Sequence, residues 1–331
     1  MELPPPRGEL SRWLVRHLIH AAPPTPAPRP SGPLSTAWCD DDLQLALWCC
    51  YELHYRGFAD VPAEMEWDVD VLRFRADLER HWTACLRQLC AGREVDPALP
   101  APRLLRQIVD ADDAPSLSRY LQRHATREQF REFARNRSIY QLKEADPHTF
   151  GIPRLDGAAK AAMLEIQADE YGGGRPERMH AELFRRTMRW LGLSDEYGYY
   201  VPQVPAVTLA VSNLMSLFGL HRRWLAALLG HLAVFEMTST EPNRRYAAGV
   251  RRLGGDDDAA RYFDEHVEAD AVHEQIAAHD LCGSYLRAHP DAAIDLAFGA
   301  TACLVVDGLF AKTLLVSWQE SSRRAPIAAA R

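Results

Sequence analysis

The sequence predicts an all-α protein. Apolar residues recur at spacings of three and four along most of the chain, which is the period of a helix with one buried face. Alternating runs of β-branched residues bounded by hairpin turns, which would indicate strands, are absent from the 331 residues. The composition is 47% hydrophobic and 25% charged, which is ordinary for a globular chain and sufficient for a sizeable core.

The N-terminal third divides into three parts. Residues 1–35 hold nine of the 22 prolines, which favours an extended, mobile arm, although the amphipathic stretch 11–20 could instead dock as a helix. Helical spacing follows over residues 40–55 and 69–89, and it resumes over 116–134 after a connector rich in Pro, Asp and Arg at 91–115. We therefore expect residues 36–135 to form a helical N-terminal portion.

The remaining chain carries the longest helical patterns. They cover about residues 156–191, 205–218, 222–238, 257–288 and 291–318. Long helices that follow one another across short connections are typical of a bundle. We expect residues 136–322 to form a core bundle and residues 323–331 to be a tail.

Charge and cysteine content exclude several classes of protein. A net charge of −7 and a pI near 6.0 argue against binding to a nucleic acid backbone. The seven cysteines include no Cys-x-x-Cys pair, so neither a disulfide framework nor a zinc ribbon is indicated. The apolar stretches 224–238 and 292–311 are interrupted by His231, Glu236 and Asp295, which argues against membrane spans. We expect a cytoplasmic protein that binds neither nucleic acid nor membrane.

The sharpest chemical signal lies in the 257–288 pattern, as His266-x3-Asp270-x2-His273. At about 100° per residue, Asp270 lies about 40° from His266 and His273 about 20° from it on the other side. Two imidazoles and a carboxylate on one helix face form a donor set that suits iron, manganese or zinc. The alternative is a solvated polar face.

Two further groups extend this signal. Glu177 and His180 have the Glu-x-x-His spacing that helical di-iron carboxylate proteins use, and Glu170 precedes Glu177 by seven residues. Glu236 follows an apolar run in which an unpaired carboxylate is costly. His231 lies about 140° around that helix from Glu236, so we interpret it as a core or surface histidine outside the site.

Taken together, these residues form a ligand set large enough for two metal ions. A mononuclear site would leave several of them buried and unsatisfied, and a hydrolytic zinc site usually has only three protein ligands. We therefore predict a non-haem di-iron site with seven metal ligands: Glu170, Glu177, His180, Glu236, His266, Asp270 and His273.

The ordered set resembles the ligand pattern of the haem-oxygenase-like di-iron oxidases, also called iron-containing redox enzymes. The resemblance covers roughly residues 140–320 and implies a haem-oxygenase-like helical bundle. Glu-x-x-His matches Glu177 and His180, a lone Glu matches Glu236, and the third motif matches His266, Asp270 and His273. The spacing is most similar to that of the di-iron domain of the streptozotocin-pathway N-oxygenase, in which Glu170 would match an additional Glu. A ferritin-like bundle is the nearest alternative.

The resemblance implies an oxidoreductase with two Fe(II)/Fe(III) ions, O2 as co-substrate and an external electron donor. N-oxygenation of an amine, guanidine or amino-acid-like small molecule in specialised metabolism is the favoured reaction. Oxidative C–C cleavage or decarboxylation of a fatty or amino acid is an alternative, and a non-catalytic helical binding protein is another. No Gly-x-Gly-x-x-Gly fingerprint for a hydride cofactor is present, so the reductant stays unidentified. Helical domains of this class commonly pair, which makes a homodimer an expectation.

Other polar residues have weaker assignments. Arg244, Arg245 and Tyr246 are candidates for substrate contact, because arginine suits recognition of a carboxylate, although a solvated salt-bridge network is the alternative. Glu144 is interpreted as a surface residue, with a role beside the site as the alternative. Gly172, Gly173 and Gly174 would weaken a continuous helix by about 1 kcal/mol each, so a turn there is an equal expectation.

Overall fold

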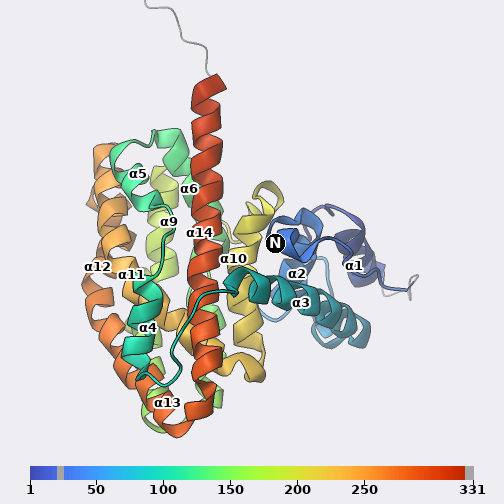
Figure 1. The fold of residues 1–331 in the computed structure, drawn as a ribbon. Coiled ribbons are helices and arrows are strands. Elements are labelled where there is room, and N and C mark those ends of the chain that lie inside the picture. Colours follow the sequence, from blue (N-terminus) through green and yellow to red (C-terminus); the bar gives the residue numbers. More distant parts are fainter. Residues whose placement is uncertain (21–25, 325–331) are drawn as a thin grey trace, which may run out of the picture.

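The computed structural model describes residues 1–20 and 26–324, and in these ranges the chain forms helices and no strand (Figure 1). The prediction of an all-α protein is confirmed. The helices of the first half are α1 (Glu9–His20), α2 (Asp41–Glu52), α3 (Val69–Cys90), α4 (Ala101–Asp110), α5 (Leu117–Arg123), α6 (Arg127–Gln141) and α7 (Asp146–Thr149). Those of the second half are α8 (Gly157–Glu170), α9 (His180–Trp190), α10 (Ala206–Leu220), α11 (Leu225–Arg252), α12 (Asp257–Gln275), α13 (Gly283–Ala288) and α14 (Ala293–Arg324).

Shorter helical segments connect these elements. A π-helical segment, Ile276–Cys282, joins α12 to α13. The 3-10 turns are Leu34–Cys39, Ala63–Trp67, Ile152–Arg154, Gly172–Gly174, Pro176–Arg178, Val201–Gln203, Arg222–Trp224 and Pro290–Ala292. Helix starts follow local capping chemistry, since Thr126 and Gln129 form a capping box on α6 and the side chain of Asp256 caps α12.

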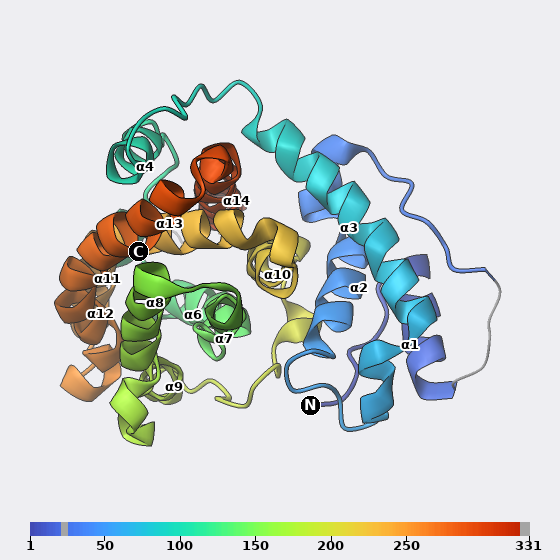
Figure 2. The same cartoon turned by 90° about the horizontal axis from the view of Figure 1, so that it is seen from below.

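A helical bundle forms the larger part of the molecule. In Figure 2, helices α8 to α12 are arranged around α6 and α7, and α11 packs against both α12 and α14. Helix α10 is buried from Ala206 to Gly219, which its almost wholly apolar sequence requires. The backbones of α11 and α14 approach closely at two glycines. A Cβ on Gly230 would lie 2.0 Å from the Leu296 carbonyl oxygen, and one on Gly299 would lie 1.9 Å from that of Ala227.

The first three helices form a separate layer on one side of the bundle (Figure 2). Helix α1 packs against α2, and it buries Trp13, Leu14 and Leu18. The expectation of a mobile arm is therefore wrong for Glu9–His20, where the apolar face of the docked helix outweighs the flanking prolines. Residues 21–25 of the predicted arm lie outside the described residues, as do residues 325–331 of the predicted tail.

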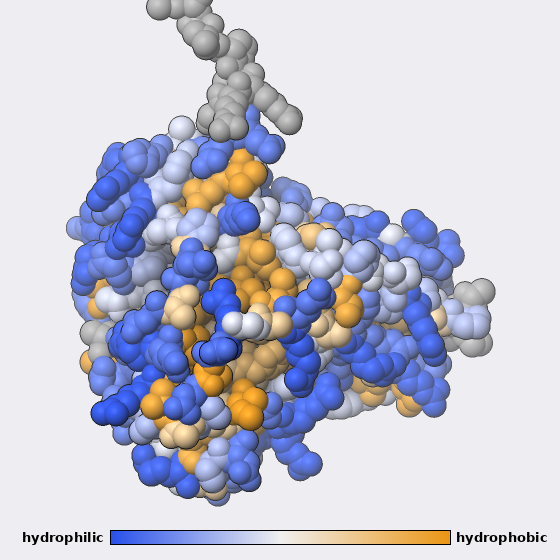
Figure 3. All heavy atoms as spheres, in the orientation of Figure 1, coloured by the Kyte–Doolittle hydropathy of each residue, from blue (hydrophilic) through white to orange (hydrophobic). Residues whose placement is uncertain are grey.

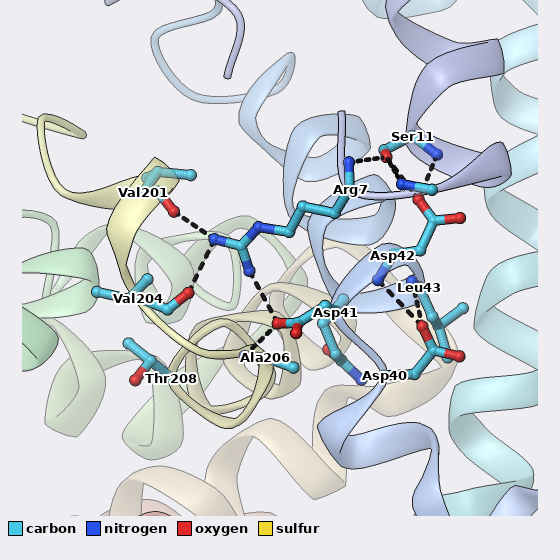
Figure 4. A network of polar contacts seen from close by, with 12 residues as sticks. Arg7, Ser11, Asp40, Asp41, Asp42, Leu43, Val201, Val204, Ala206 and Thr208 are labelled. Atoms are coloured by element: carbon cyan, nitrogen blue, oxygen red, sulfur yellow. Dashed lines mark hydrogen bonds and ion pairs between the residues drawn. The ribbon is translucent and has the colours of Figure 1, made fainter. Parts of the chain in front are cut away.

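A polar network fastens the N-terminal segment to the chain before α10 (Figure 4). The Arg7 guanidinium donates to the carbonyl oxygens of Val201 and Val204 at 2.7 and 2.8 Å and pairs with Asp41 at 3.1 Å. Asp42 in turn accepts from the first backbone amides of α1, at 2.7 Å from Leu10 N. Because these bonds join segments almost 200 residues apart, the N-terminal layer has a defined place on the bundle.

The predicted boundary near residue 135 has no counterpart in the packing. Helices α4 and α5 pack against α11 and α14, and α6 packs against α9 and α10.

Helix α14 belongs to the core despite its length and apolar composition. Among the described residues, Pro290–Ser321 is the one stretch long and apolar enough to cross a membrane, but 61% of its most apolar window is buried inside the fold. Apolar residues also gather along the middle of the face that Figure 3 shows, and Ile294 and Val316 of α14 are exposed. Packing against α10 and α11 accounts for the apolar sequence, while the cytoplasmic location and a homodimer stay predictions.

Candidate metal centre

Two groups of buried carboxylates and histidines lie inside the bundle. The first contains Glu144, Glu170, His180 and His266, and the second contains Glu170, Glu236 and His273. In each group the ligand atoms lie within 4.8 Å of one another, and all these residues are buried. Glu170 belongs to both groups, so its two oxygens can serve two neighbouring ions.

Five segments of the chain supply these side chains. Glu144 lies in the turn between α6 and α7, Glu170 is the last residue of α8, and His180 is the first of α9. Glu236 lies near the middle of α11, and His266 and His273 lie two turns apart on α12. Since α9 and α11 both pack against α12, the six side chains converge on one region.

The distances between the donor atoms suit the ligands of a metal ion. Oε2 of Glu170 and Nδ1 of His180 are 3.0 Å apart. Two ligands at right angles, each about 2.1 Å from an ion, are separated by about 3 Å. The spacing between Oε2 of Glu236 and Nδ1 of His273 is similar, at 3.4 Å. The residues present therefore fit divalent cations.

Hydrogen bonds fix the orientation of two histidines. Nδ1–H of His266 donates to the carbonyl oxygen of Tyr262 at 2.8 Å, which leaves Nε2 directed toward Glu144 at 3.7 Å. Nε2 of His273 bonds to Asp169 at 3.1 Å, which leaves Nδ1 on the side of Glu236. Metal-binding histidines usually bond through the second ring nitrogen to a carbonyl or carboxylate in this way.

A tyrosine holds the carboxylate of Glu144. The Tyr262 hydroxyl lies 3.0 Å from Oε1 and 2.8 Å from Oε2 of Glu144, and both residues are buried. A hydroxyl that donates to the carboxylate restricts its orientation while leaving oxygen lone pairs for an ion.

Burial and mutual charge shift the pKa values of the cluster. Burial raises the pKa of Glu144 to about 7, against the opposing effect of His266. Burial acts in the same direction on Glu170, but the charge and hydrogen bond of His180 outweigh it and lower the pKa of Glu170. Burial disfavours the charged form of His273, yet Glu236 and Asp169 together raise its pKa to about 9. The metal-free protein thus holds protons that a cation would displace.

Glu177 lies outside both clusters. The continuous helix over 156–191 is interrupted at Gly172–Gly174, where all three glycines have positive φ, and Pro176–Arg178 form a 3-10 turn before α9 begins at His180. The Glu177 side chain is consequently exposed, and its shared helix face with His180 does not exist. Glu170 takes the place that the Glu-x-x-His spacing predicts for Glu177, and this prediction is corrected.

Glu144 is a candidate ligand that the predicted ligand set lacks. It is 7% exposed, so its interpretation as a surface residue is wrong. Helical spacing offered a signal, because Arg137, Tyr140 and Glu144 continue the buried face of α6 by one turn.

The other predicted site residues lie in different places relative to the two clusters. The side chain of Asp270 lies outside the described residues, although its backbone belongs to α12. Arg244 and Arg245 form ion pairs with Glu241 and do not line the site, as the salt-bridge alternative anticipated. Tyr246 lines a cavity next to Glu144 and His266.

His231 lies in the core, as its interpretation outside the site required. Its Nδ1 is 3.2 Å from Nε2 of His148, and both rings are buried. Burial lowers the pKa of both, that of His148 to about 4, so the pair is neutral near pH 7.

A comparison with known protein families identifies the family of this chain. The model of the family described as iron-containing redox enzymes matches residues 131–308, more than half of the chain. The chain belongs to this family. An iron-containing redox enzyme is an oxidoreductase, so the predicted resemblance is confirmed and the non-catalytic alternative is set aside.

A curated relative matches part of the chain. The iron-containing redox enzyme is 27% identical over 153 residues to nitrosourea synthase of Streptomyces achromogenes subsp. streptozoticus. The match includes 46% of this chain and 32% of the relative, so the chain spans about a third of the relative's length. Together with the buried histidines and glutamates, the family supports iron as the metal of this oxidoreductase.

The glycine turn gives a direct test of how the centre is built. A Cβ on Gly172 would lie 2.7 Å from backbone atoms of Arg178 and Met179, whereas one on Gly174 would meet nothing within 4 Å. Both residues have positive φ, so alanine at either costs about 1–2 kcal/mol of strain. Only Gly172→Ala should also displace the turn before His180, and we expect it to weaken Fe(II) binding by about tenfold or more. Equal Fe(II) affinities of Gly172→Ala and Gly174→Ala in anaerobic titrations would contradict this role.

Proposed function

We propose that the protein binds two iron ions, one at each cluster, and uses O2 to oxidise a small molecule by N-oxygenation. The observation that carries the dinuclear proposal is the membership of Glu170 in both clusters. A carboxylate shared by two groups of buried donors is the arrangement that dinuclear iron proteins use. Asp270, which follows His266 by one turn of α12, is proposed as a further ligand of the second ion, beside Glu236 and His273.

The residues around the centre have distinct proposed roles. The four carboxylates offset the charge of the ions, and the three histidines supply neutral nitrogen donors. Tyr262 orients Glu144, and Asp169 orients His273. When bound, two ferrous ions supply electrons that reduce O2, and an external reductant of unidentified nature restores them.

N-oxygenation is favoured by the curated relative. Its name, nitrosourea synthase, denotes a product with a nitrogen–oxygen bond. The proposed substrate is accordingly a small molecule with an oxidisable nitrogen.

Anaerobic titration with Fe(II), followed by exposure to 18O2 and mass spectrometry with a panel of amines and amino acids, tests the proposal. We expect about two Fe(II) per chain and a product that has gained 18O on nitrogen. Binding of a single ion would refute the dinuclear centre. Loss of carbon dioxide or formaldehyde without oxygen on nitrogen would instead indicate oxidative C–C cleavage.

Iron affinity should depend on pH because iron competes with protons. His273 is protonated below about pH 9 in the metal-free protein, and Glu144 is protonated below about pH 7. Both groups must lose their protons to bind a cation, so the apparent Fe(II) affinity should rise from pH 6 to pH 8, by about tenfold per pH unit for each proton released. Calorimetry in buffers of different ionisation enthalpy counts these protons. Binding without proton release would show that these pKa directions are wrong.

A further inference from the structure

A small pocket touches both ligand clusters. Its volume is about 10 Å³, and a single water needs roughly 10–15 Å³ on the same measure, so it can hold an atom about the size of one water. Glu144, Glu170, Glu236 and His266 of the two clusters line it. Gln167 of α8 lines it as well and belongs to neither cluster.

Gln167 carries a hydrogen-bond donor that the fold leaves unused. Its side chain is 2% exposed, and its Nε2 has no hydrogen-bond partner among the described residues. A buried amide without its hydrogen bonds costs stability, and such groups are rare in folded proteins. The donor therefore indicates a partner that binds at this site.

Neighbouring hydroxyls hold the amide in its orientation. Thr149 donates to Oε1 of Gln167 at 2.8 Å, and the Thr149 hydroxyl lies 2.9 Å from that of Tyr171. Tyr171 in turn donates to Asp146 at 2.9 Å. Because Thr149 occupies Oε1, the NH2 end of the amide is left for the pocket. The carboxylates that line the pocket also favour an N–H donor there over a carbonyl oxygen.

The position of Gln167 on α8 brings this donor near the proposed ions. Gln167 precedes Glu170 by three residues, so both side chains leave the same face of the helix. Glu170 is the carboxylate that belongs to both clusters. Since an amide does not titrate, Gln167 can donate a hydrogen bond beside the ions without adding charge to the site.

The small pocket adjoins the larger cavity that Tyr246 lines. Glu144 and His266 belong to the walls of both. The larger cavity has a volume of about 110 Å³, and Arg137 and Asp307 also line it. A ligand in the small pocket would thus contact the same candidate metal ligands that face the larger cavity.

We propose that Gln167 donates an N–H hydrogen bond to a small acceptor ligand in this pocket and thereby fixes its position beside the metal ligands. The ligand is a water, a hydroxide ion or one atom of dioxygen, which share an oxygen that accepts a hydrogen bond. This inference rests on the proposed function, because iron ions in the two clusters would bind such a ligand.

Two probes test the donor in the iron-loaded protein without turnover. Azide stands for hydroxide and is titrated into the oxidised Fe(III) protein by visible absorption. Nitric oxide stands for dioxygen, and its release from the anaerobic Fe(II) protein is measured by electron paramagnetic resonance. We expect Gln167→Met to weaken azide binding, to accelerate nitric oxide release, or both, by about fivefold or more, while about two iron ions stay bound per chain.

The pattern of change identifies the ligand. An effect on azide alone assigns the hydrogen bond to water or hydroxide, and an effect on nitric oxide alone assigns it to dioxygen. No effect on either probe would overturn the proposal. Glu165→Met is the matched control, because Glu165 is exposed on the same helix and should leave both probes unchanged.

A second variant tests the same bond without removing the amide. Thr149→Val removes the hydroxyl that holds Oε1 of Gln167, so it should weaken the same probe as Gln167→Met. Thr149 is not among the candidate metal ligands, and the variant therefore decides the question if Gln167→Met lowers the iron content. Unchanged affinity in Thr149→Val would then overturn the proposal.

Urea unfolding of the metal-free protein separates this role from a purely structural one. Methionine has a similar volume and needs no hydrogen-bond partner, and Thr149 keeps the Ala145 carbonyl oxygen at 3.1 Å as an acceptor. Gln167→Met should therefore leave the urea midpoint unchanged or raise it, and a marked fall would overturn the proposal. Absence of iron from the loaded wild-type protein would overturn the proposed function itself, and this inference with it.

Discussion

Replacing Glu170 with alanine is expected to remove both iron ions of the proposed dinuclear centre. Glu170 is the one carboxylate that belongs to both clusters among the described residues, and its loss leaves each ion with fewer ligands and one less negative charge. The Fe(II) content after anaerobic loading and desalting should fall from about two per chain to below about one half, with turnover abolished.

Two glutamate variants complete this comparison. Glu144→Ala removes a ligand from the first cluster alone, so it should retain about one ion. Glu177→Ala changes an exposed residue that the sequence pattern had placed among the ligands, and it should retain both ions. Retention of both ions by Glu170→Ala, or their loss from Glu177→Ala, would show that the ligand assignment is wrong.

Replacing Lys143 with methionine is expected to destabilise the fold by about 3–5 kcal/mol. Nζ of Lys143 lies 3.0 Å from Oε2 of Glu52, with side-chain exposures of 1% and 0%, and Glu52 also accepts a hydrogen bond from Tyr197 at 2.7 Å. The variant leaves the Glu52 carboxylate buried without its cation. Because α2 carries Glu52 and the turn after α6 carries Lys143, the pair joins the N-terminal layer to the bundle.

Urea unfolding of the metal-free protein, monitored by circular dichroism and by tryptophan fluorescence, measures this loss of unfolding free energy. The double variant Lys143→Met, Glu52→Gln should recover part of the loss, because it removes the uncompensated charge. Arg73→Met is the matched control, since the Arg73–Asp70 pair is exposed and should contribute less than about 1 kcal/mol. A similar effect of Lys143→Met and Arg73→Met would contradict a stabilising buried pair.

The sequence predicted the helical fold well because helical periodicity is a local property. Most predicted helices of the bundle correspond to observed ones, and His266 and His273 occupy one face of α12 as their spacing requires. The docking of α1 was harder to predict, since it depends on bonds from Asp42 and Arg7 to segments distant in the sequence.

The ligand set was harder to predict where backbone geometry changes. Between Glu170 and His180 the chain leaves the helix through glycines with positive φ, so angular arithmetic no longer relates side chains on the two sides. The spacing rule therefore added the exposed Glu177 to the predicted ligands beside Glu170, the buried carboxylate of α8. Glu144 was placed beside the site only as an alternative to a surface position, although its spacing from Arg137 and Tyr140 continues the buried face of α6.

The glycine contact between α11 and α14 determines more than local packing. Gly299 precedes Asp307 by eight residues, about 12 Å along α14. A side chain at Gly230 or Gly299 would increase the distance between α11 and α14. The distance between Asp307 on α14 and Arg137 on α6 would then increase as well. The width of the cavity, and with it the range of molecules admitted, thus depends on two residues that do not touch its contents. A glycine-to-alanine change at Gly230 or Gly299 can therefore alter which molecules the cavity admits, while every residue that lines the cavity stays the same.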